Sequence, residues 1–342
     1  MIQTLFIAGA GGYLGPKMIE FFLAKGHRII ALDRFFFGNT LDDLIKNKNI
    51  TVIKEDIRSI NKSYFKDVDT IINLASISND PASELNPEIT RAINYEGALR
   101  LAKIAKEMKV KKYIFASSCS VFGKGRGTVS EVSPTSPISE YAKSKINAEK
   151  DLISLADNTY SVTILRMATL YGLSKKRMRF DLIVNLMTLH AWKNKKIFIM
   201  GGGKQWRPLV HIDDCVDAFD IIHNEKIIEK INREIFNIGS NDQNYQVFQV
   251  ANFFKKHFPD IEIEVAPDDP DKRSYRVSFD KAKKILGFKP KKSIDDGIKE
   301  IRDSLEKGEI TDDIRTNTSW YYRYLIDADN MLSALKLHGK LF

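Results

Sequence analysis

A glycine-rich turn near the start of the chain limits the possible folds more than any other feature of the sequence. Gly9-Ala10-Gly11-Gly12-Tyr13-Leu14-Gly15 follows a short apolar run at 4–8 and opens a helical pattern at about 16–25. A strand, a glycine turn and a helix in this order allow the backbone to approach a pyrophosphate at the positive end of the helix. The turn predicts a dinucleotide site that includes Gly9, Gly12, Tyr13, Leu14 and Gly15, against the alternative of a purely structural turn.

Strand-like runs then alternate with helical patterns through the first half of the chain. Further strands are expected at 28–32, 51–53, 70–74, 113–116 and 162–165, with helices around 94–108 and 139–156. This alternation predicts an α/β protein with a Rossmann-type, doubly wound parallel sheet. The second half is less regular, with apolar segments at 197–199, 209–212 and 235–237. The segment 259–278, rich in Asp, Pro and charge, is expected to form a surface loop or lobe element.

The expected domain boundaries follow from this pattern. Residues 1–171 form the dinucleotide-binding domain, and 208–240 return to it. Residues 172–207 and 241–308 form a smaller C-terminal substrate-binding lobe, and 309–342 are a C-terminal extension. The extension carries Trp320, Tyr321, Tyr322 and Tyr324 before a helical pattern. For this extension, packing or contact between subunits is favoured over a role in the active site.

Composition argues against several classes of protein. The 342 residues are 43% hydrophobic, which suits a sizeable core, and the longest apolar runs are too short to cross a bilayer. We find no signal peptide or membrane anchor, and Cys119 and Cys215 make no disulfide framework, so a cytoplasmic location is expected. No Cys/His spacing resembles a metal site. The net charge of +9 is spread over stretches that also carry acidic residues, which favours a solvated surface over nucleic-acid binding, with anionic substrates as the second option.

Two carboxylates follow predicted strands. Asp33 ends the second strand about twenty residues after the turn, where a carboxylate accepts hydrogen bonds from the adenosine ribose. A carboxylate there repels a 2′-phosphate, so NAD is favoured over NADP. The neighbouring Arg34 would instead favour NADP. Asp56 follows the third strand and is a candidate for the adenine amino group, with an ordinary turn aspartate as the alternative.

Tyr141 and Lys145 form a spaced pair in the second half of the predicted dinucleotide domain. Residues four apart share one face of a helix, so the ammonium is expected to lower the pKa of the phenol towards neutrality. A tyrosinate beside a nicotinamide can then take a proton from a sugar hydroxyl. The spacing is common by chance, and a solvated helix face is the alternative.

Taken together, these motifs resemble those of the extended short-chain dehydrogenase/reductase family, specifically its nucleotide-sugar epimerases and dehydratases. The resemblance covers about 1–305 and rests on motifs in the same order along the chain: the glycine turn, Asp33, Asp56-Ile57-Arg58, Asn73-Leu74-Ala75, Asn94, Ser117-Ser118, Tyr141-x-x-x-Lys145, Arg166 to Tyr171-Gly172, Gly201 to Arg207, His211-x-Asp213, Asn237-Ile238-Gly239, Asp271-x-Arg273 and Lys281-Ala282.

The resemblance implies a role for each of these site residues. Tyr141 is the catalytic base or acid, and Lys145 holds the nicotinamide ribose. Ser118 forms a hydrogen bond with the reacting sugar oxygen; the alternative is a serine at the end of a strand that caps a turn. The remaining residues of the NAD site are Ile57 beside Asp56, Leu74, Ala75, Asn94 as a brace, and Ser117.

Recognition of the nucleotide-diphosphate sugar is expected from the second half of the chain. The resemblance places Arg207 at the diphosphate, and a guanidinium suits phosphate because it bonds two oxygens at once. Arg273 and the basic stretch 175–179 are further candidates, and Asn185 is expected at the diphosphate or the sugar. Surface cations are the alternative for the basic residues.

Departures from the family pattern narrow the reaction. The 4,6-dehydratases follow their catalytic residue with Asp and Glu, whereas Cys119 and Ser120 follow Ser118 here. We therefore expect an NAD-dependent 4-epimerase, with a sugar-nucleotide dehydrogenase or ketoreductase as the alternative. A non-catalytic dinucleotide-binding protein fits less well, because Tyr141 and Lys145 are both present. Cys119 is expected to pack rather than react. The resemblance also implies a homodimer that meets through the helices bearing Asn94 and Tyr141.

Overall fold

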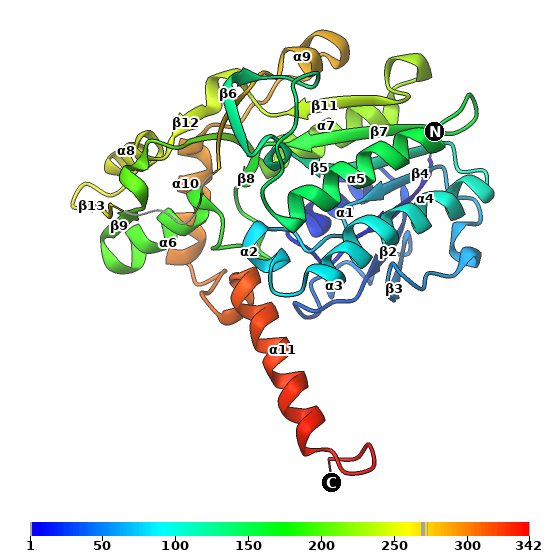
Figure 1. Cartoon of the computed structure of the whole chain (residues 1–342), viewed down its shortest axis with the longest axis horizontal. Coiled ribbons are helices and arrows are strands. Elements are labelled where there is room, and N and C mark those ends of the chain that lie inside the picture. Colours follow the sequence, from blue (N-terminus) through cyan, green and yellow to red (C-terminus); the bar gives the residue numbers. More distant parts are fainter. Residues whose placement is uncertain (1, 268–270, 272, 342) are drawn as a thin grey trace.

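A seven-stranded parallel sheet forms the centre of the larger part of the molecule (Figure 1). The computed structural model describes residues 2–267, 271 and 273–341. Its strand order is β11-β7-β5-β4-β1-β2-β3. The bounds are β1 Thr4–Ala8, β2 Arg28–Asp33, β3 Ile50–Lys54, β4 Thr70–Asn73, β5 Lys112–Ser118, β7 Ser161–Met167 and β11 Glu234–Ile238. The predicted α/β class and the predicted Rossmann-type parallel sheet are confirmed.

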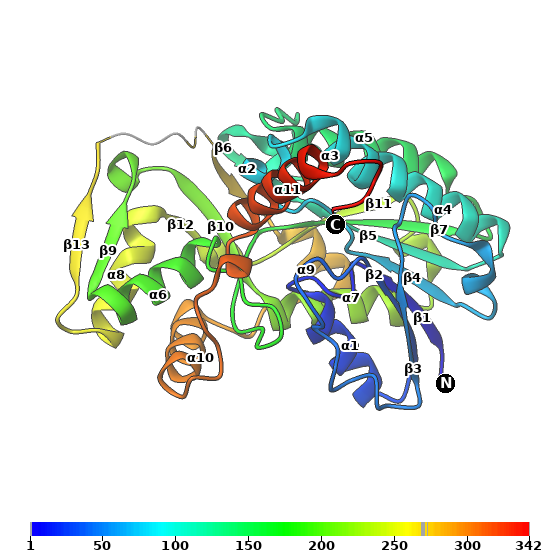
Figure 2. The ribbon, with the colours of Figure 1, turned by 90° about the horizontal axis from the view of Figure 1, so that it is seen from below.

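Helices cover both faces of this sheet. Figure 2 shows α4 (Ala98–Glu107) and α5 (Glu140–Leu155) on one side and α1 (Gly15–Ala24) and α7 (Ile212–Asn224) on the other. Because successive side chains of a strand point to opposite faces, Leu5 and Ile7 of β1 pack with α1 and α7, whereas Phe6 packs with α4 and α5. A strand buried on both faces is apolar throughout, which explains why this run was readable from the sequence.

The smaller part of the molecule has its own core. Helices α6 (Ile183–Asn194), α8 (Val247–His257) and α10 (Ile294–Glu306) pack around a separate apolar cluster. Short strand groups complete it: β9 (Lys196–Ile199) with β13 (Glu262–Val265), β10 (Trp206–His211) with β8 (Thr169–Tyr171) and β12 (Asn244–Gln246), and β14 (Ser274–Val277) with β6 (Lys124–Val129). Helix α9 spans Asp280–Leu286. The predicted loop 259–278 contains β13 and β14, and its residues 268–270 and 272 lie outside the described part.

The C-terminal extension forms a helix, α11 (Thr318–Leu335). Helix α11 contacts α2 (Asp80–Ser83), which is followed in the chain by α3 (Pro87–Arg91). The far end of α11 projects away from the body of the molecule (Figure 1). Among the described residues, no helix combines the length and the apolar character needed to cross a membrane.

Candidate active site

A large cavity of about 1270 Å³ lies where the carboxyl ends of the parallel strands face the smaller part. Its walls come from the glycine turn, the ends of β2, β4 and β5, helix α5, the smaller part and α11. Ligands of open parallel sheets bind at this edge. The volume exceeds the roughly 300–1,000 Å³ of a pocket for one small ligand, so a dinucleotide and a second ligand can share it.

The glycine turn forms the floor of one end of the cavity. Gly9 has φ of 82°, and a Cβ built on it would lie 2.6 Å from the backbone nitrogen of Ala75. A Cβ on Gly15 would lie 2.2 Å from the carbonyl oxygen of Ala10. Both positions therefore require glycine. Among the described residues no side chain caps the start of α1, so its first amides face the cavity as a site for an anion.

Asp33 and Asp56 differ in how their carboxylates are engaged. Asp33 accepts hydrogen bonds from the amides of Gly11, at 3.0 Å, and Phe35, at 2.6 Å, and burial raises its pKa. Asp56 pairs with Arg34 at 2.8 Å and Arg58 at 2.7 Å, and the hydrogen bond from Arg58 holds its pKa well below the usual range. Both carboxylates line the cavity, but Asp56 is largely occupied by the two arginines.

The loop after β4 is held in place by two asparagines. Asn73 accepts a hydrogen bond from the amide of Ala75, and Asn94 bonds both the amide (2.8 Å) and the carbonyl (3.1 Å) of Ile77. Asn94 lies in a π-helical turn, Ala92–Gly97, and it also donates to Ser144 of α5 at 3.3 Å. A π-turn often marks a functional position. Asn94 therefore acts as a brace, while Leu74, Ala75 and Ile57 line the cavity.

Helix α5 brings Tyr141 and Lys145 to the cavity wall. Ser139 caps this helix by accepting from the amide of Ala142, which fixes its first turn. The Lys145 ammonium donates to the carbonyl of Ala116 at 2.7 Å and lies 5.6 Å from the centre of the Tyr141 ring. Ser118, at the end of β5, is hydrogen-bonded to Tyr141. The structure thus brings Ser118, Tyr141 and Lys145 together.

The pKa of Tyr141 departs from the expectation made from the sequence. Burial raises the pKa of Tyr141 to about 12, and the nearby Asp80 carboxylate raises it as well, while the hydrogen bond with Ser118 lowers it. Burial lowers the pKa of Lys145 to about 7. The predicted lowering of the Tyr141 pKa towards neutrality is therefore wrong for this structure, because desolvation outweighs the effect of an ammonium turned towards Ala116.

Behind the catalytic face, a buried ion pair fixes α5 to the sheet. Glu149 of α5 binds Arg166 of β7 at 2.6 Å, and both side chains are at most 5% exposed. Ser117 borders the cavity, but its hydroxyl donates to Glu149 of this ion pair. The thiol of Cys119 donates to the carbonyl of Arg166, and burial raises its pKa. Cys119 therefore packs, as expected.

At the other end of the cavity, two arginines share one carboxylate. Asp271 lies 2.8 Å from Arg207 and 2.6 Å from Arg273, and Arg273 also binds Asp80. The guanidinium of Arg207 donates further to the carbonyls of Trp206 and Arg273. Arg207 and Arg273, both predicted as candidates for the diphosphate, line the cavity, where their guanidinium groups are engaged by carboxylates.

Asn185 lies behind the cavity rather than in its wall. It is fully buried, its amide nitrogen donates to Tyr13 and to the carbonyl of Arg179, and its oxygen accepts from the amide of Gly172. The prediction of a contact with the diphosphate or the sugar is not supported, because all these bonds stay within the protein. Tyr13 lines the cavity, and its hydroxyl contacts the carbonyl of Gly172.

The basic stretch 175–179 divides into two parts. Lys175 pairs with Glu309 at 2.7 Å, and Lys176 pairs with Asp43, both at the surface. Arg177 and Arg179 turn inward and line the cavity. Arg179 forms a two-pronged ion pair with Asp181, at 2.9 and 2.8 Å. The surface-cation alternative therefore holds for the two lysines and fails for the two arginines.

The C-terminal helix α11 also borders the cavity, which its sequence pattern did not indicate. Six residues at and after the start of α11 line the cavity: Asn317, Ser319, Tyr322, Leu325, Ile326 and Asp329. Packing or contact between subunits was favoured over an active-site role for this extension, and the structure adds that part of it borders the cavity. The run of aromatic residues in α11 indicated that the helix packs against another surface. It did not indicate which surface.

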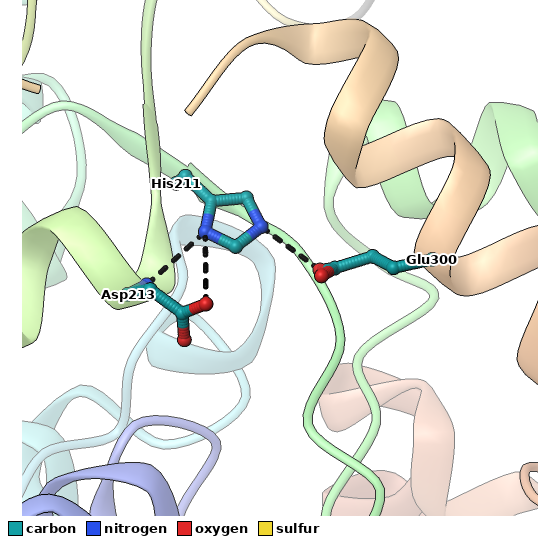
Figure 3. A group of neighbouring side chains, drawn as sticks. All are labelled: His211, Asp213 and Glu300. Carbon is teal, nitrogen blue, oxygen red and sulfur yellow. Dashed lines mark hydrogen bonds and ion pairs between the residues drawn. The ribbon is translucent and has the colours of Figure 1, made fainter. Parts of the chain in front are cut away.

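His211, Asp213 and Glu300 are not among the residues that line this cavity; they form a separate cluster where the end of β10 and the start of α7 meet α10 (Figure 3). Among the described residues, their oxygen and nitrogen atoms converge closely enough to hold a metal ion. The amide of Asp213 donates to Nδ1 of His211 at 3.2 Å, so Nε2 donates to Glu300 at 2.8 Å. Glu300 also accepts from the amide of Leu173. With both ring nitrogens in hydrogen bonds, the group ties α10 to the start of α7.

Comparison with known proteins defines the family. A family model described as the NAD-dependent epimerase/dehydratase family matches residues 5–239. An uncharacterized UDP-glucose epimerase of Bacillus subtilis is 30% identical over 317 residues, covering 86% of this chain and 96% of the relative. A putative UDP-glucose 4-epimerase of Methanocaldococcus jannaschii is 27% identical, covering 87% and 96%. The chain belongs to the NAD-dependent epimerase/dehydratase family.

Solved structures agree with the fold. A UDP-glucuronic acid 4-epimerase from Bacillus cereus, in complex with UDP-glucuronic acid and NAD, superimposes with a TM-score of 0.78 at 23% identity. The match covers 89% of this chain and 99% of that structure, so part of this chain has no counterpart there. A UDP-glucose 4-epimerase from Thermotoga maritima gives a TM-score of 0.78 at 24% identity. The family's cofactor is NAD, as predicted, and the glycine cradle, the open start of α1 and Asp33 fit it.

Proposed function

We propose that this protein is an NAD-dependent nucleotide-sugar 4-epimerase that acts on a UDP-sugar. The observation that carries the proposal is the meeting of Ser118, Tyr141 and Lys145 in a cavity of about 1270 Å³, which has room for a dinucleotide and a nucleotide sugar together. Relatives named as UDP-glucose epimerases support the choice of substrate. Cys119 and Ser120 after Ser118 offer no acid pair for a 4,6-dehydration.

The proposed first step is oxidation at C4 of the sugar. Tyr141, as tyrosinate, takes the proton of the C4 hydroxyl, and Ser118 holds the same oxygen by a hydrogen bond. Bound NAD would accept the hydride from C4 and return it in the second step. In its oxidised form, its nicotinamide ring would place a positive charge beside Tyr141. That positive charge, with Lys145, opposes the burial that raises the pKa of Tyr141 to about 12. The C4–H and O–H bonds break, and a 4-keto sugar forms.

The second step reverses the first on the other face of the sugar. The keto sugar turns within the cavity, the hydride returns to the opposite face of C4, and Tyr141 gives its proton back to the oxygen. Arg207 and Arg273 would hold the diphosphate fixed while the sugar turns. No residue beyond Ser118, Tyr141 and Lys145 is required, and the cofactor ends the cycle as it began.

The test uses purified protein with no added cofactor. We expect interconversion of UDP-glucose and UDP-galactose, or of the corresponding uronates, and loss of at least about a hundredfold in rate for Tyr141→Phe, since acid–base groups contribute 10²–10⁴. Tyr324→Phe, a change at an exposed tyrosine, is the matched control and should keep full activity. Assays include the uronates because relatives also include UDP-glucuronic acid decarboxylases, whose product would have lost a carbon.

A dehydrogenase or ketoreductase is the second candidate, and it is supported by the same three catalytic residues. It requires net turnover of the cofactor, so NADH would accumulate in proportion to the sugar oxidised. Stoichiometric NADH without interconversion would replace the epimerase proposal by this one. If Tyr141→Phe changed no conversion, a non-catalytic dinucleotide-binding protein would be favoured instead.

We also propose a homodimer formed through α4 and α5, the helices that the family resemblance assigns to the interface. Both helices lie on one face of the sheet, and their outward sides are open to a partner (Figure 2). Light scattering should give about twice the chain mass of 39.0 kDa. A single-chain mass would remove this proposal without affecting the proposed reaction.

A further inference from the structure

Helix α11 presents one face to the cavity and another to solvent. Ser319, Tyr322, Ile326 and Asp329 recur at intervals of three or four residues, so they share a face, and all of them line the cavity. Trp320 and Tyr324, on the other side, are 67% and 55% exposed. Figure 1 shows that α11 starts against the body of the molecule and that its far end projects away from it. The helix therefore forms a wall of the site.

The wall is attached to the loop that follows Asp33. The hydroxyl of Tyr321 donates to the carbonyl of Phe36 at 2.9 Å. The Tyr322 ring lies edge-on to Phe36, with centroids 6.1 Å apart, and tilted against Phe37 at 5.5 Å. These phenylalanines come three and four residues after Asp33, so a ribose held by Asp33 lies beside this aromatic cluster. Burial and the Asp33 carboxylate raise the pKa of Tyr322.

A buried arginine faces the cavity from the same cluster. The Arg177 guanidinium lies 3.7 Å over the Phe37 ring and donates to the hydroxyl of Thr318, at the start of α11, at 3.1 Å. Arg177 is only 5% exposed, and its Nε has no hydrogen-bond partner among the described residues. Burial and the neighbouring Arg179 lower the pKa of Arg177 to about 10. A buried cation with an unpartnered nitrogen is costly unless an anion joins it.

We propose that α11 completes the dinucleotide site, with Tyr322 covering the ribose held by Asp33 and Arg177 binding the pyrophosphate. The open start of α1 and Arg177 line the same cavity, so a pyrophosphate held at the start of α1 would supply an anion to Arg177. The ring of Tyr322 closes the site against solvent, so the cofactor leaves slowly. This inference rests on the proposed function. An epimerase reuses the same NAD, so it benefits from a cofactor that leaves slowly.

The test measures release of the cofactor from the full-length protein without any sugar. Protein loaded with NADH is mixed with excess NAD, and the loss of bound NADH fluorescence gives the dissociation rate. We expect Tyr322→Ala to speed release at least about tenfold, since loss of a well-packed aromatic contact costs about 1.4 kcal/mol or more. Tyr324→Ala, two residues away on the exposed side, should release NADH at the unchanged rate.

Two further variants separate the ring from the charge. Tyr322→Leu keeps an apolar wall and serves if Tyr322→Ala does not fold, with an expected rate between those of wild type and Tyr322→Ala. Arg177→Met fills the same space without charge, and we expect it to weaken NAD binding about tenfold or more while leaving adenosine binding unchanged.

Equal release rates for wild type, Tyr322→Leu and any folded Tyr322→Ala would overturn the role of α11. Unchanged NAD affinity in Arg177→Met would overturn the pyrophosphate contact. Because no sugar is present, these results stand even if no nucleotide sugar proves to be a substrate, so failure of the proposed reaction is seen separately.

Discussion

Tyr141 acts as a base only if its surroundings reverse the effect of its own burial. Burial raises its pKa to about 12, and burial lowers the pKa of Lys145 to about 7. Near neutral pH the phenol is protonated and the ammonium is only partly charged. A positive nicotinamide would favour the tyrosinate and so oppose the raised pKa of Tyr141, whereas it would disfavour the Lys145 ammonium further. In the proposed reaction, Tyr141 would therefore act as a base only when the oxidised cofactor is bound.

Lys145 gives a prediction about stability that needs no substrate. Between pH 7 and 8.5 the unfolded chain keeps the Lys145 proton, with a pKa near 10.4, while the folded protein loses it at about 7. The unfolded state then binds more protons, so the free energy of unfolding rises with pH. Relative to Lys145→Met, wild type without bound dinucleotide should gain on the order of 1–2 kcal/mol over this interval, measured by urea denaturation.

Lys143→Met is the matched control for this measurement, because Lys143 is exposed on the same helix. Its curve of unfolding free energy against pH should run parallel to that of wild type. If the Lys145→Met curve is parallel as well, the lysine titrates at its usual pKa and the account of its burial is wrong.

Asp33 and Asp56 offer a second comparison between single residues. Asp33→Asn removes a charged acceptor at the ribose, and hydrogen bonds to charged groups contribute about 1.5–3 kcal/mol. We expect NAD affinity to fall tenfold or more and NADP affinity to rise, because the repulsion of a 2′-phosphate is lost. Asp56→Asn should change NAD affinity less, since Arg34 and Arg58 already engage that carboxylate. Calorimetric titration of both variants decides between these outcomes, and a larger loss in Asp56→Asn would contradict the assignment.

The sequence predicted those site residues whose positions depend only on nearby residues in the chain. Tyr141 and Lys145 meet because they are one helical turn apart, and Asp33 follows its strand directly. Asn185 shows where such prediction fails. Its amide has the right chemistry for a phosphate, but Gly172, Arg179 and Tyr13 surround it in the folded chain. The partner of a side chain is set by tertiary packing, which no spacing in the sequence records.

The helices and strands were predictable where burial gives a strong pattern. The apolar runs of β1, β4 and β5 correspond to observed strands because those strands are covered on both faces. The short strands β6 and β14 have polar, partly exposed sequences, and they pair with each other outside the central sheet. Helix α11 was expected, but its position over the cavity depends on contacts with Phe36 and Phe37, about 285 residues earlier in the chain.

The contact between α10 and α7 supports a prediction about one element. Glu300 of α10 accepts from buried His211 and from the amide of Leu173, so Glu300→Ala leaves both donors without this acceptor. At about 1–3 kcal/mol for each unsatisfied group, the free energy of unfolding should fall by about 3 kcal/mol. Glu306→Ala on the same helix, 56% exposed and 3.6 Å from Arg302, should cost at most about 0.5 kcal/mol.

The same two variants test whether His211, Asp213 and Glu300 bind a metal. If the group is only a hydrogen-bonded junction, EDTA and added Zn²⁺ should each leave the melting temperature of wild type unchanged. A rise with Zn²⁺ in wild type and in Glu306→Ala, but not in Glu300→Ala, would instead identify a metal centre.

The whole molecule is built around a cavity that neither part encloses alone. The larger part contributes the glycine turn, Asp33 and the catalytic helix, whereas the smaller part contributes Arg207 and Arg273. Ligands that bridge the two parts bind the folded protein and not the unfolded chain, so they raise its stability by mass action. Stability with different ligands therefore reports which molecules fill each end of the cavity.

This linkage gives a prediction that identifies the nucleotide. NAD at a hundred times its dissociation constant should add about 2.7 kcal/mol to the free energy of unfolding, seen as a higher melting temperature. UDP should raise it further in the NAD-loaded protein, because the arginine end of the cavity is separate from the glycine turn. Glucose at the same concentration lacks the diphosphate and should have no effect. A rise with ADP, CDP, GDP or dTDP in place of UDP would keep the diphosphate site and change the nucleotide of the proposed substrate.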